Sequence, residues 1–308
     1  MGRYVLRRLL QLIPVFLGTT FLIYVLVYAV PGDPFAGKCG DRPCPPAYVA
    51  KVTAQYNLND NVVVQYAKYI GNVLQGNFGE TYSGRAVSDI ITTSYPITLK
   101  LALVALLFEI VFGLTAGVLT GLGRKGFFDN LVLIGTLVLI ALPVFVTAYV
   151  LRLLFGIKWQ IVSATVSPGA PWGELILPGF VLASLSLAYA TRITRTSIAE
   201  NSRADYVRTA KAKGLPQRRV IGVHLLRNSL IPVVTFFGTD LGALMAGAIV
   251  TEGIFNINGI GRETYRAVTT KEGATVTGLV VVLVLVYLLA NLVVDLLYAV
   301  LDPRIRYE

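Results

Sequence analysis

Five ionisable side chains lie inside long apolar stretches and are the residues most capable of chemistry. They are Glu109, Arg152, Arg195, Asp240 and Asp295. A charge at the centre of a bilayer costs about 2.5 to 3.5 kcal/mol on insertion scales, so such residues are functional candidates. The alternative is that each residue is paired or extends its charge towards the membrane surface. Asp240 is the strongest candidate, because it lies about ten residues into its stretch, near the middle of a membrane helix.

The sequence lacks the motifs of the common catalytic sites. No GxxxxGK[ST] phosphate loop occurs, since Gly37-Lys38 is followed by Cys39. No HExxH occurs, and the lone His224 cannot complete a Ser/His/Asp set within its polar loop. The chain is therefore expected to be non-catalytic and to bind no metal or cofactor of its own.

Composition and hydropathy place the chain in a membrane. Of its 308 residues 55% are hydrophobic, and the mean hydropathy is +0.68. A membrane-spanning helix needs about 20 apolar residues, and six stretches satisfy this requirement. The predicted fold is an all-α polytopic membrane protein with spans at roughly 9–30, 97–122, 131–155, 175–195, 230–250 and 275–300.

The distribution of basic residues predicts the orientation. With both termini on the inner side, sixteen lysines and arginines lie inside and nine lie outside. Loops rich in lysine and arginine stay cytoplasmic, so both termini and the loop 196–229 are predicted to be cytoplasmic. Residues 31–96 then form an extracytoplasmic loop.

Residues 196–229 form the most polar part of the chain. Between Arg192 and Arg227 there are nine lysines and arginines against two acids, Glu200 and Asp205. Ser202 followed by Asp205 is an N-cap pattern, and Gly214 is a typical end for the helix that they begin. Charge alone is equally compatible with a solvated basic loop beside lipid headgroups.

A second short helix is predicted after this first one. Pro216 suits the first turn of a helix. Val220, Val223 and Leu226 follow at spacings that place them on one helical face.

The string Tyr206 to Leu215, YVRTAKAKGL, with Asn228 and Pro232 beyond it, resembles the EAA loop of ABC importer permeases. The resemblance is to the dipeptide/oligopeptide (DppB/OppB-type) binding-protein-dependent transport family. The general EAA pattern has Glu-Ala-Ala where this chain has Arg208, Thr209 and Ala210, so its glutamate is missing. The Ile-Pro ending at 231–232 also falls later than in that pattern. The N-terminal RYVLRRLLQLIPVF and the tail LDPRIR extend the similarity over nearly the whole chain.

The resemblance implies a type I importer permease whose first loop helix docks into a separate ATPase subunit. The residues implied in this coupling are Ser202, Asp205, Tyr206, Val207, Thr209, Ala210, Gly214 and Leu215. The same resemblance places Asp240, Gly242 and Ala246 near the translocation pathway. Small residues in the second and fifth spans, Gly117 and Gly238 among them, are predicted to allow close helix packing.

The family also implies the partners and the setting. They are a second homologous permease, two ATPase domains that bind ATP and magnesium, an extracytoplasmic substrate-binding protein, and the lipid of a bacterial inner membrane; no nucleic acid is expected. The implied cargo is dipeptides or oligopeptides. Haem, nickel chelates and glutathione remain alternative cargoes, because several substrates share this permease type.

The extracytoplasmic loop 31–96 carries two amphipathic patterns, at about 47–56 and 62–74. Cys39 and Cys44 precede them, and an oxidising environment would allow these two thiols to form a disulfide. Near the C-terminus, Glu252 to Gly261 resembles the family's E-x-x-F…P-G-x-G loop, with Asn258 in place of the proline.

Two other classes of membrane protein compete with this interpretation. A proton-coupled transporter could use Asp240 and Glu109 as relays, but the sequence shows no inverted repeats and has a single dominant basic loop. A passive channel would require rings of charge or filter loops, and neither is found.

Overall fold

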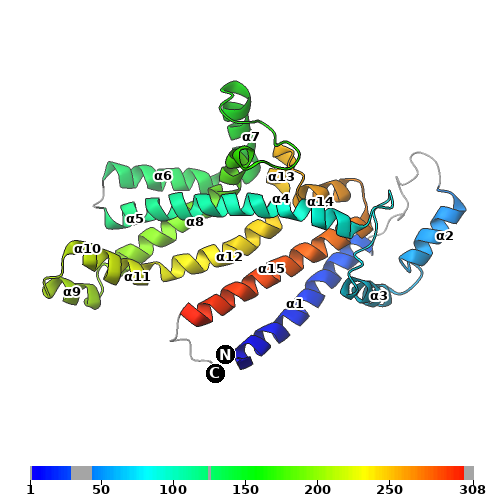
Figure 1. Ribbon diagram of the computed structural model, residues 1–308, viewed down its shortest axis with the longest axis horizontal. Coiled ribbons are helices and arrows are strands. Elements are labelled where there is room, and N and C mark those ends of the chain that lie inside the picture. The colour runs from blue at the N-terminus through cyan, green and yellow to red at the C-terminus, as the bar shows by residue number, and fades with distance from the viewer. Residues whose placement is uncertain (1, 29–43, 124–125, 302–308) are drawn as a thin grey trace.

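The computed structural model describes residues 2–28, 44–123 and 126–301, which form an elongated bundle of helices (Figure 1). Four helical segments are long and apolar enough to cross a membrane: Val5–Tyr28, Val87–Leu122, Trp172–Asn201 and Gly273–Leu296. The number rises to six if each of two bent pairs is one span: Phe127–Ala141 with Val144–Lys158, and Gln217–Ser229 with Ile231–Met245. The predicted all-α membrane fold is confirmed, with four to six apolar spans among the described residues.

The second span begins ten residues earlier than predicted. It consists of α4 (Val87–Phe108), the π-helical η1 (Glu109–Gly113) and α5 (Leu114–Leu122). The first turns of α4 contain many polar residues, so hydropathy alone missed them. Tertiary burial supports them, because Val87 and Ile90 pack in one cluster with Ile260 and Leu279.

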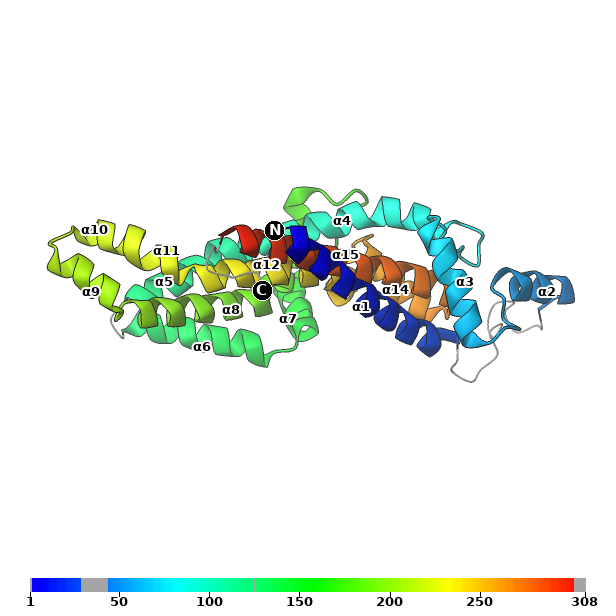
Figure 2. The same ribbon diagram turned by 90° about the horizontal axis from the view of Figure 1, so that it is seen from below.

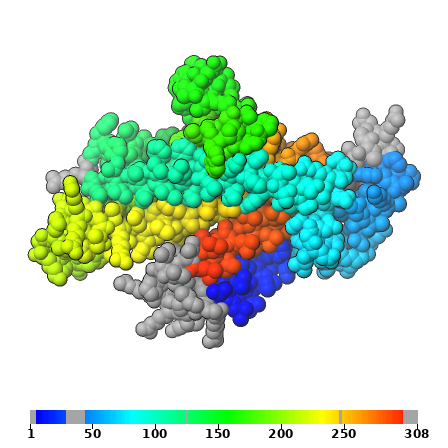
Figure 3. All heavy atoms as spheres, in the orientation of Figure 1, coloured from blue at the N-terminus to red at the C-terminus, as the bar shows by residue number. Residues whose placement is uncertain are grey.

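The third span is not the straight helix that was expected. It consists of α6 (Phe127–Ala141), α7 (Val144–Leu151) and η2 (Arg152–Lys158), with a bend of 108° between the first helix and the rest. Pro143 has no N–H to donate and disfavours helical backbone at Leu142, which is extended with ψ 128°. The segment that follows projects from the bundle, as Figures 1 and 3 show.

Helix α8 (Ile176–Asn201), preceded by the short η3 (Trp172–Leu175), packs against α4, α5, α6 and α12. Its contact with α5 is close because α5 contributes glycines. A Cβ on Gly117 would lie 2.5 Å from Thr194 Cβ, and one on Gly121 would lie 2.9 Å from Ile198 Cβ. The predicted role of small residues in the second span is confirmed.

The fifth and sixth spans are α12 (Ile231–Gly247) and α15 (Gly273–Leu301). They also pack through glycine, because a Cβ on Gly238 would lie 2.7 Å from Val294 Cγ1. Helix α1 (Gly2–Tyr28) lies along α15, and Arg8 forms an ion pair with Asp295 across 3.3 Å. The start of α1 and the end of α15 are therefore neighbours (Figure 2).

The two predicted amphipathic helices are present as α2 (Pro46–Gln55) and α3 (Val62–Leu74). Helix α3 packs on α1 through aromatic residues. The Tyr66 hydroxyl donates to the Leu17 carbonyl at 2.9 Å, and the rings of Tyr24 and Tyr69 lie 5.4 Å apart. Cys39 lies outside the described residues, so the disulfide with Cys44 stays a prediction.

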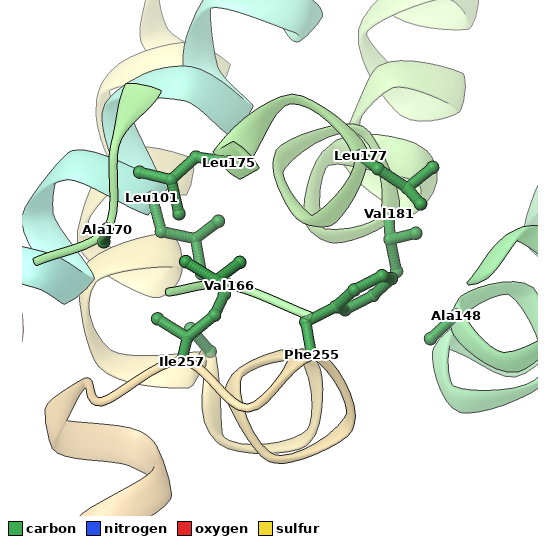
Figure 4. Close-up of a cluster of buried hydrophobic side chains, with 10 residues drawn as sticks. Leu101, Ala148, Val166, Ala170, Leu175, Leu177, Val181, Phe255 and Ile257 are labelled. Atoms are coloured by element: carbon green, nitrogen blue, oxygen red, sulfur yellow. The ribbon is translucent and has the colours of Figure 1, made fainter. Parts of the chain in front are cut away.

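Two short helices, α13 (Ile249–Phe255) and α14 (Ile260–Thr269), connect the fifth and sixth spans. Phe255 of α13 and Ile257 of the turn between the two helices join a buried cluster with Leu101 of α4 and Val181 of α8 (Figure 4). Val166 joins this cluster from the loop before α8, and its N–H donates to the Phe255 carbonyl at 2.9 Å. The cluster ties both connecting segments to the bundle at the end away from α9.

Candidate functional site

The basic loop folds into a compact helical unit at one end of the molecule (Figure 1). It comprises α9 (Asp205–Ala212), α10 (Gln217–Arg219), η4 (Val220–Leu225) and α11 (Leu226–Ser229). Helix α9 ends as predicted, because Gly214 adopts a left-handed φ of +71°. The predicted cap is wrong. Ala204 occupies the N-cap position, while Ser202 terminates α8 and donates its hydroxyl hydrogen to the Ala199 carbonyl.

Two of the predicted coupling residues face the protein itself. Val207 and Ala210 are 1% and 4% exposed and pack against Ile198 of α8, with Leu215 at the edge of the cluster. Their apolar side chains hold α9 on α8. In this conformation both residues have an internal packing role, and their part in coupling stays a prediction.

The register of the second loop helix also differs from the prediction. Val220 and Leu225 are buried, whereas Val223 is 51% exposed. A π-helical turn accounts for this, because η4 brings residues five apart onto one face, where an α-helix would bring residues three or four apart. The expected face of Val220, Val223 and Leu226 is wrong at Val223.

The outward face of α9 carries the remaining coupling candidates. Asp205, Tyr206 and Thr209 are exposed, and so is Gly214 just beyond the helix. The Tyr206 hydroxyl donates to Asn201 Oδ1 at 2.5 Å, which fixes its ring against the end of α8. This face is exposed and free for contact with a partner.

The loop is fastened to the membrane helices at both of its ends. Ser197 Oγ on α8 donates to the Ser229 carbonyl at 2.8 Å, and Ser229 Oγ donates to the Ser197 carbonyl at 3.4 Å. Helix α12 begins two residues after Ser229, with a bend of 45°. These hydrogen bonds therefore link α8 to the segment that leads directly into α12.

Three of the five intramembrane ionisable residues have partners. Arg195 forms a two-pronged ion pair with Asp129 of α6, with both N–O distances 2.9 Å. Asp295 pairs with Arg8, and Arg152 donates to the Ile254 carbonyl at 2.8 Å. These contacts support the structural interpretation for all three residues.

Glu109 and Asp240 differ from that group. Glu109 is 0% exposed, and no donor among the described residues reaches either of its carboxyl oxygens. The carboxyl group of Asp240 on α12 lies beside it. Ser186 Oγ donates to Asp240 Oδ1 at 3.0 Å, while Asp240 Oδ2 accepts from no donor. The structure thus brings together two acids that lie on different spans.

Gly242 and Ala246 are the other two residues predicted to lie near the translocation pathway. Gly242 is buried against α15, where a Cβ would lie 3.3 Å from Ala290 Cβ. The side chain of Ala246 lies outside the part of the chain that the structure describes.

Glu252 is a buried acid whose role sequence analysis missed. It is 0% exposed and accepts hydrogen bonds from Thr98 Oγ1 at 2.6 Å and from the Arg262 N–H at 2.9 Å. Thr98 in turn accepts from the Ile260 N–H at 2.9 Å, so the two side chains cap α14. Desolvation raises the pKa of Glu252 to about 7, although these hydrogen bonds oppose the shift. The signal available in the sequence was the pair of glycines at 259 and 261.

Those glycines leave space for the Glu252 carboxyl group. A Cβ on Gly259 would lie 2.3 Å from Glu252 Oε1, and one on Gly261 would lie 3.0 Å from Glu252 Oε2. Gly259 is therefore explained by the buried carboxyl group, whereas Gly261 also allows close approach of the α13 backbone, because its Cβ would lie 2.8 Å from Ile249 Cα.

Comparison with known proteins agrees with this architecture. Residues 113–307 match the family model of the binding-protein-dependent transport system inner membrane component, and residues 1–102 match its N-terminal companion. The chain is 37% identical to the di/tripeptide transport system permease protein DppB of Pseudomonas aeruginosa (strain UCBPP-PA14), over 99% of each chain. It is 36% identical to the dipeptide transport system permease protein DppB of Escherichia coli (strain K12) and 34% identical to the oligopeptide transport system permease protein OppB of Haemophilus influenzae (strain ATCC 51907), over 100% of each chain.

These matches cover both the bundle and the loop, and the fold has the apolar spans expected of a multi-pass membrane protein. The chain belongs to the family of binding-protein-dependent transport system inner membrane components.

Proposed function

We propose that this chain is the transmembrane subunit of an ATP-driven importer that moves dipeptides or oligopeptides across the bacterial inner membrane. The observation that carries the proposal is the basic loop, in which an exposed helix, α9, is joined rigidly to two spans. The peptide cargo is supported by the relatives, which are named as dipeptide, di/tripeptide and oligopeptide permeases.

In this proposal the basic loop lies in the cytoplasm, where loops rich in lysine and arginine accumulate. The opposite end, with α2, α3, α13 and α14, faces the external binding protein. Two ATPase domains bind ATP and magnesium and dock on the outward face of α9. A second, similar permease completes the translocation pathway, and this chain itself catalyses no reaction.

The coupling route follows from packing. Closure of the ATPase domains pushes on α9, and the cluster around Val207 and Ala210 passes that force to Ile198 of α8. The Ser197–Ser229 hydrogen bonds make α8 and α12 move as a pair. The pathway then opens through these two spans, because both lead directly from the loop into the membrane.

Purification of the tagged chain from its native membrane tests the proposal. We expect an ATPase and a second permease to co-purify, and expect the complex in vesicles to take up a labelled dipeptide only with ATP and the binding protein. Competition with haem, a nickel chelate and glutathione distinguishes the cargoes. Uptake driven by an imposed pH gradient without ATP would refute the ABC assignment.

A further inference from the structure

The carboxyl groups of Glu109, which is buried, and Asp240, which is half-buried, have no role in the coupling route described above. Carboxylate oxygens only accept hydrogen bonds, so contact between two carboxyl groups becomes a bond only when one of them carries a proton. Two ionised carboxylates in direct contact repel each other, and inside a membrane no water screens that repulsion. One proton on the pair would remove this repulsion and turn the contact into a hydrogen bond.

No cation in the surrounding helices is placed to replace that proton. Within the described residues, η1, α5 and α12 carry no lysine, arginine or histidine. On α8, Arg192 donates to Thr136 Oγ1 and Arg195 pairs with Asp129, both on α6. On α4, Lys100 lies 5.8 Å from the ring centre of Trp172.

The other acidic and hydroxyl groups on the surrounding helices either have partners elsewhere or are partly exposed. Asp295, the acid of α15, pairs with Arg8 of α1. Tyr189 of α8 is 45% exposed, and Tyr287 of α15 is 41% exposed. The donor that the structure shows at the pair is Ser186 Oγ, which reaches Asp240 and leaves both oxygens of Glu109 without a donor.

The position of the pair gives it mechanical importance. Asp240 belongs to α12 and Ser186 to α8, and these two spans continue into the basic loop. Glu109 belongs to the second span, which does not continue into that loop. Glu109 also begins the π-helical segment η1, a distortion that occurs frequently at functional positions. A displacement of α12 away from the second span would separate the two carboxyl groups.

We propose that Glu109 and Asp240 share one proton, and that this proton is a latch holding α12 against η1 in the conformation described here. Opening of the latch separates the two groups when the basic loop moves α12. Interhelical hydrogen bonds of this kind shift a two-state equilibrium by about threefold to twentyfold. The inference rests on the proposed function for its place in the transport cycle, but its test requires no transport.

The proton can be observed directly in the complete complex in lipid nanodiscs. Infrared difference spectra between wild type and the double variant Glu109→Gln with Asp240→Asn should contain the C=O band of a protonated carboxylic acid. Ser184→Ala is the matched control, because Ser184 is buried on α8, the helix of Ser186, and bonds only to the Val181 carbonyl among the described groups. Its spectrum should keep the band. A double variant that keeps the complete wild-type carboxylic acid band would overturn the proposal.

The latch itself is tested by spin labels at Leu107 of α4 and Val234 of α12, which are 61% and 52% exposed. Glu109→Leu should raise the ratio of molecules with separated labels to molecules with close labels by about threefold to twentyfold. Glu109→Gln should stay closed, because its amide can donate to ionised Asp240. Raising the pH should open the wild type and leave Glu109→Gln unchanged.

Equal distances in wild type and Glu109→Leu, or the same pH response in wild type and Glu109→Gln, would refute the latch. These readouts are independent of cargo. A complex without ATP-driven peptide uptake refutes the proposed function and leaves the result on the latch standing.

Discussion

At the scale of single residues, the buried carboxyl group of Glu252 is satisfied by a few specific hydrogen-bond donors. Glu252 and Thr98 are 154 residues apart in the chain, yet together they accept the hydrogen bonds that begin α14. Burying a carboxyl group without donors would cost several kcal/mol, and these donors offset that cost. The position of the segment between the fifth and sixth spans therefore depends on the Glu252 carboxyl group and the Thr98 hydroxyl group.

The space reserved for Glu252 can be tested with one methyl group. Gly259→Ala would place a Cβ about 2.3 Å from the carboxyl group, so we expect a loss of about 1 to 3 kcal/mol in the stability of this segment. Gly253→Ala is the matched control, because no atom lies within 4 Å of its Cβ position. Amide hydrogen exchange over residues 249–269 measures the effect. Equal exchange in the two variants would show that Gly259 is not needed to make space for the Glu252 carboxyl group.

The protonation of Glu252 predicts a pH dependence of the same segment. Because desolvation raises its pKa from 4.5 to about 7, the folded segment binds the proton more tightly than an opened one. This contribution is fully present below pH 4.5 and is lost as the pH rises to about 7. Protection of the α14 amides, corrected for intrinsic exchange, should fall over this range in wild type. The Glu252→Gln variant should show a smaller change, and identical profiles would refute the linkage.

At the scale of elements, α9 has two faces with different tasks. Its inner face packs on α8 through Val207 and Ala210, and its outer face presents Tyr206 and Thr209. The loop holds its shape through this small apolar cluster and the two Ser197–Ser229 hydrogen bonds. Packing and docking can therefore be separated by substitution.

Thr209→Arg changes the exposed face, whereas Ala210→Asp buries a charge in the cluster behind it. We expect Thr209→Arg to preserve the melting temperature of the purified permease and to lose the co-purifying ATPase. Ala210→Asp should lower both, because an unpaired buried charge costs several kcal/mol. Thr269→Arg, on the exposed end of α14, is a control for added charge and should keep the ATPase. If Thr209→Arg retains the ATPase at wild-type levels, the outer face is not the docking surface.

At the scale of the whole molecule, the charge distribution predicts its orientation. The basic loop lies at one end of the elongated bundle, and the α2–α3 pair lies at the other (Figure 2). In a background with both native cysteines replaced by serine, Ser202→Cys should be inaccessible to an impermeant maleimide in whole cells. Ser83→Cys, in the exposed loop before α4, should be labelled. The reverse pattern would invert the proposed topology.

Local properties of the sequence determined much of this protein. The existence of the apolar spans follows from the length and hydropathy of each stretch, and the amphipathic helices α2 and α3 follow from periodicity within 10 and 13 residues. The left-handed end of α9 needed only Gly214. Each of these features depends on neighbours in the chain, so a local pattern is sufficient to predict it.

Tertiary structure decided the features that depend on contacts distant in the chain. Pro143 signals a break but does not set the 108° bend, and helical spacing could not anticipate the π-helical turn that leaves Val223 exposed. The meeting of Glu109 with Asp240 required three spans to converge at one depth. Such pairings arise from helix packing, because the energy of a buried polar group is set by the partner that packing brings to it.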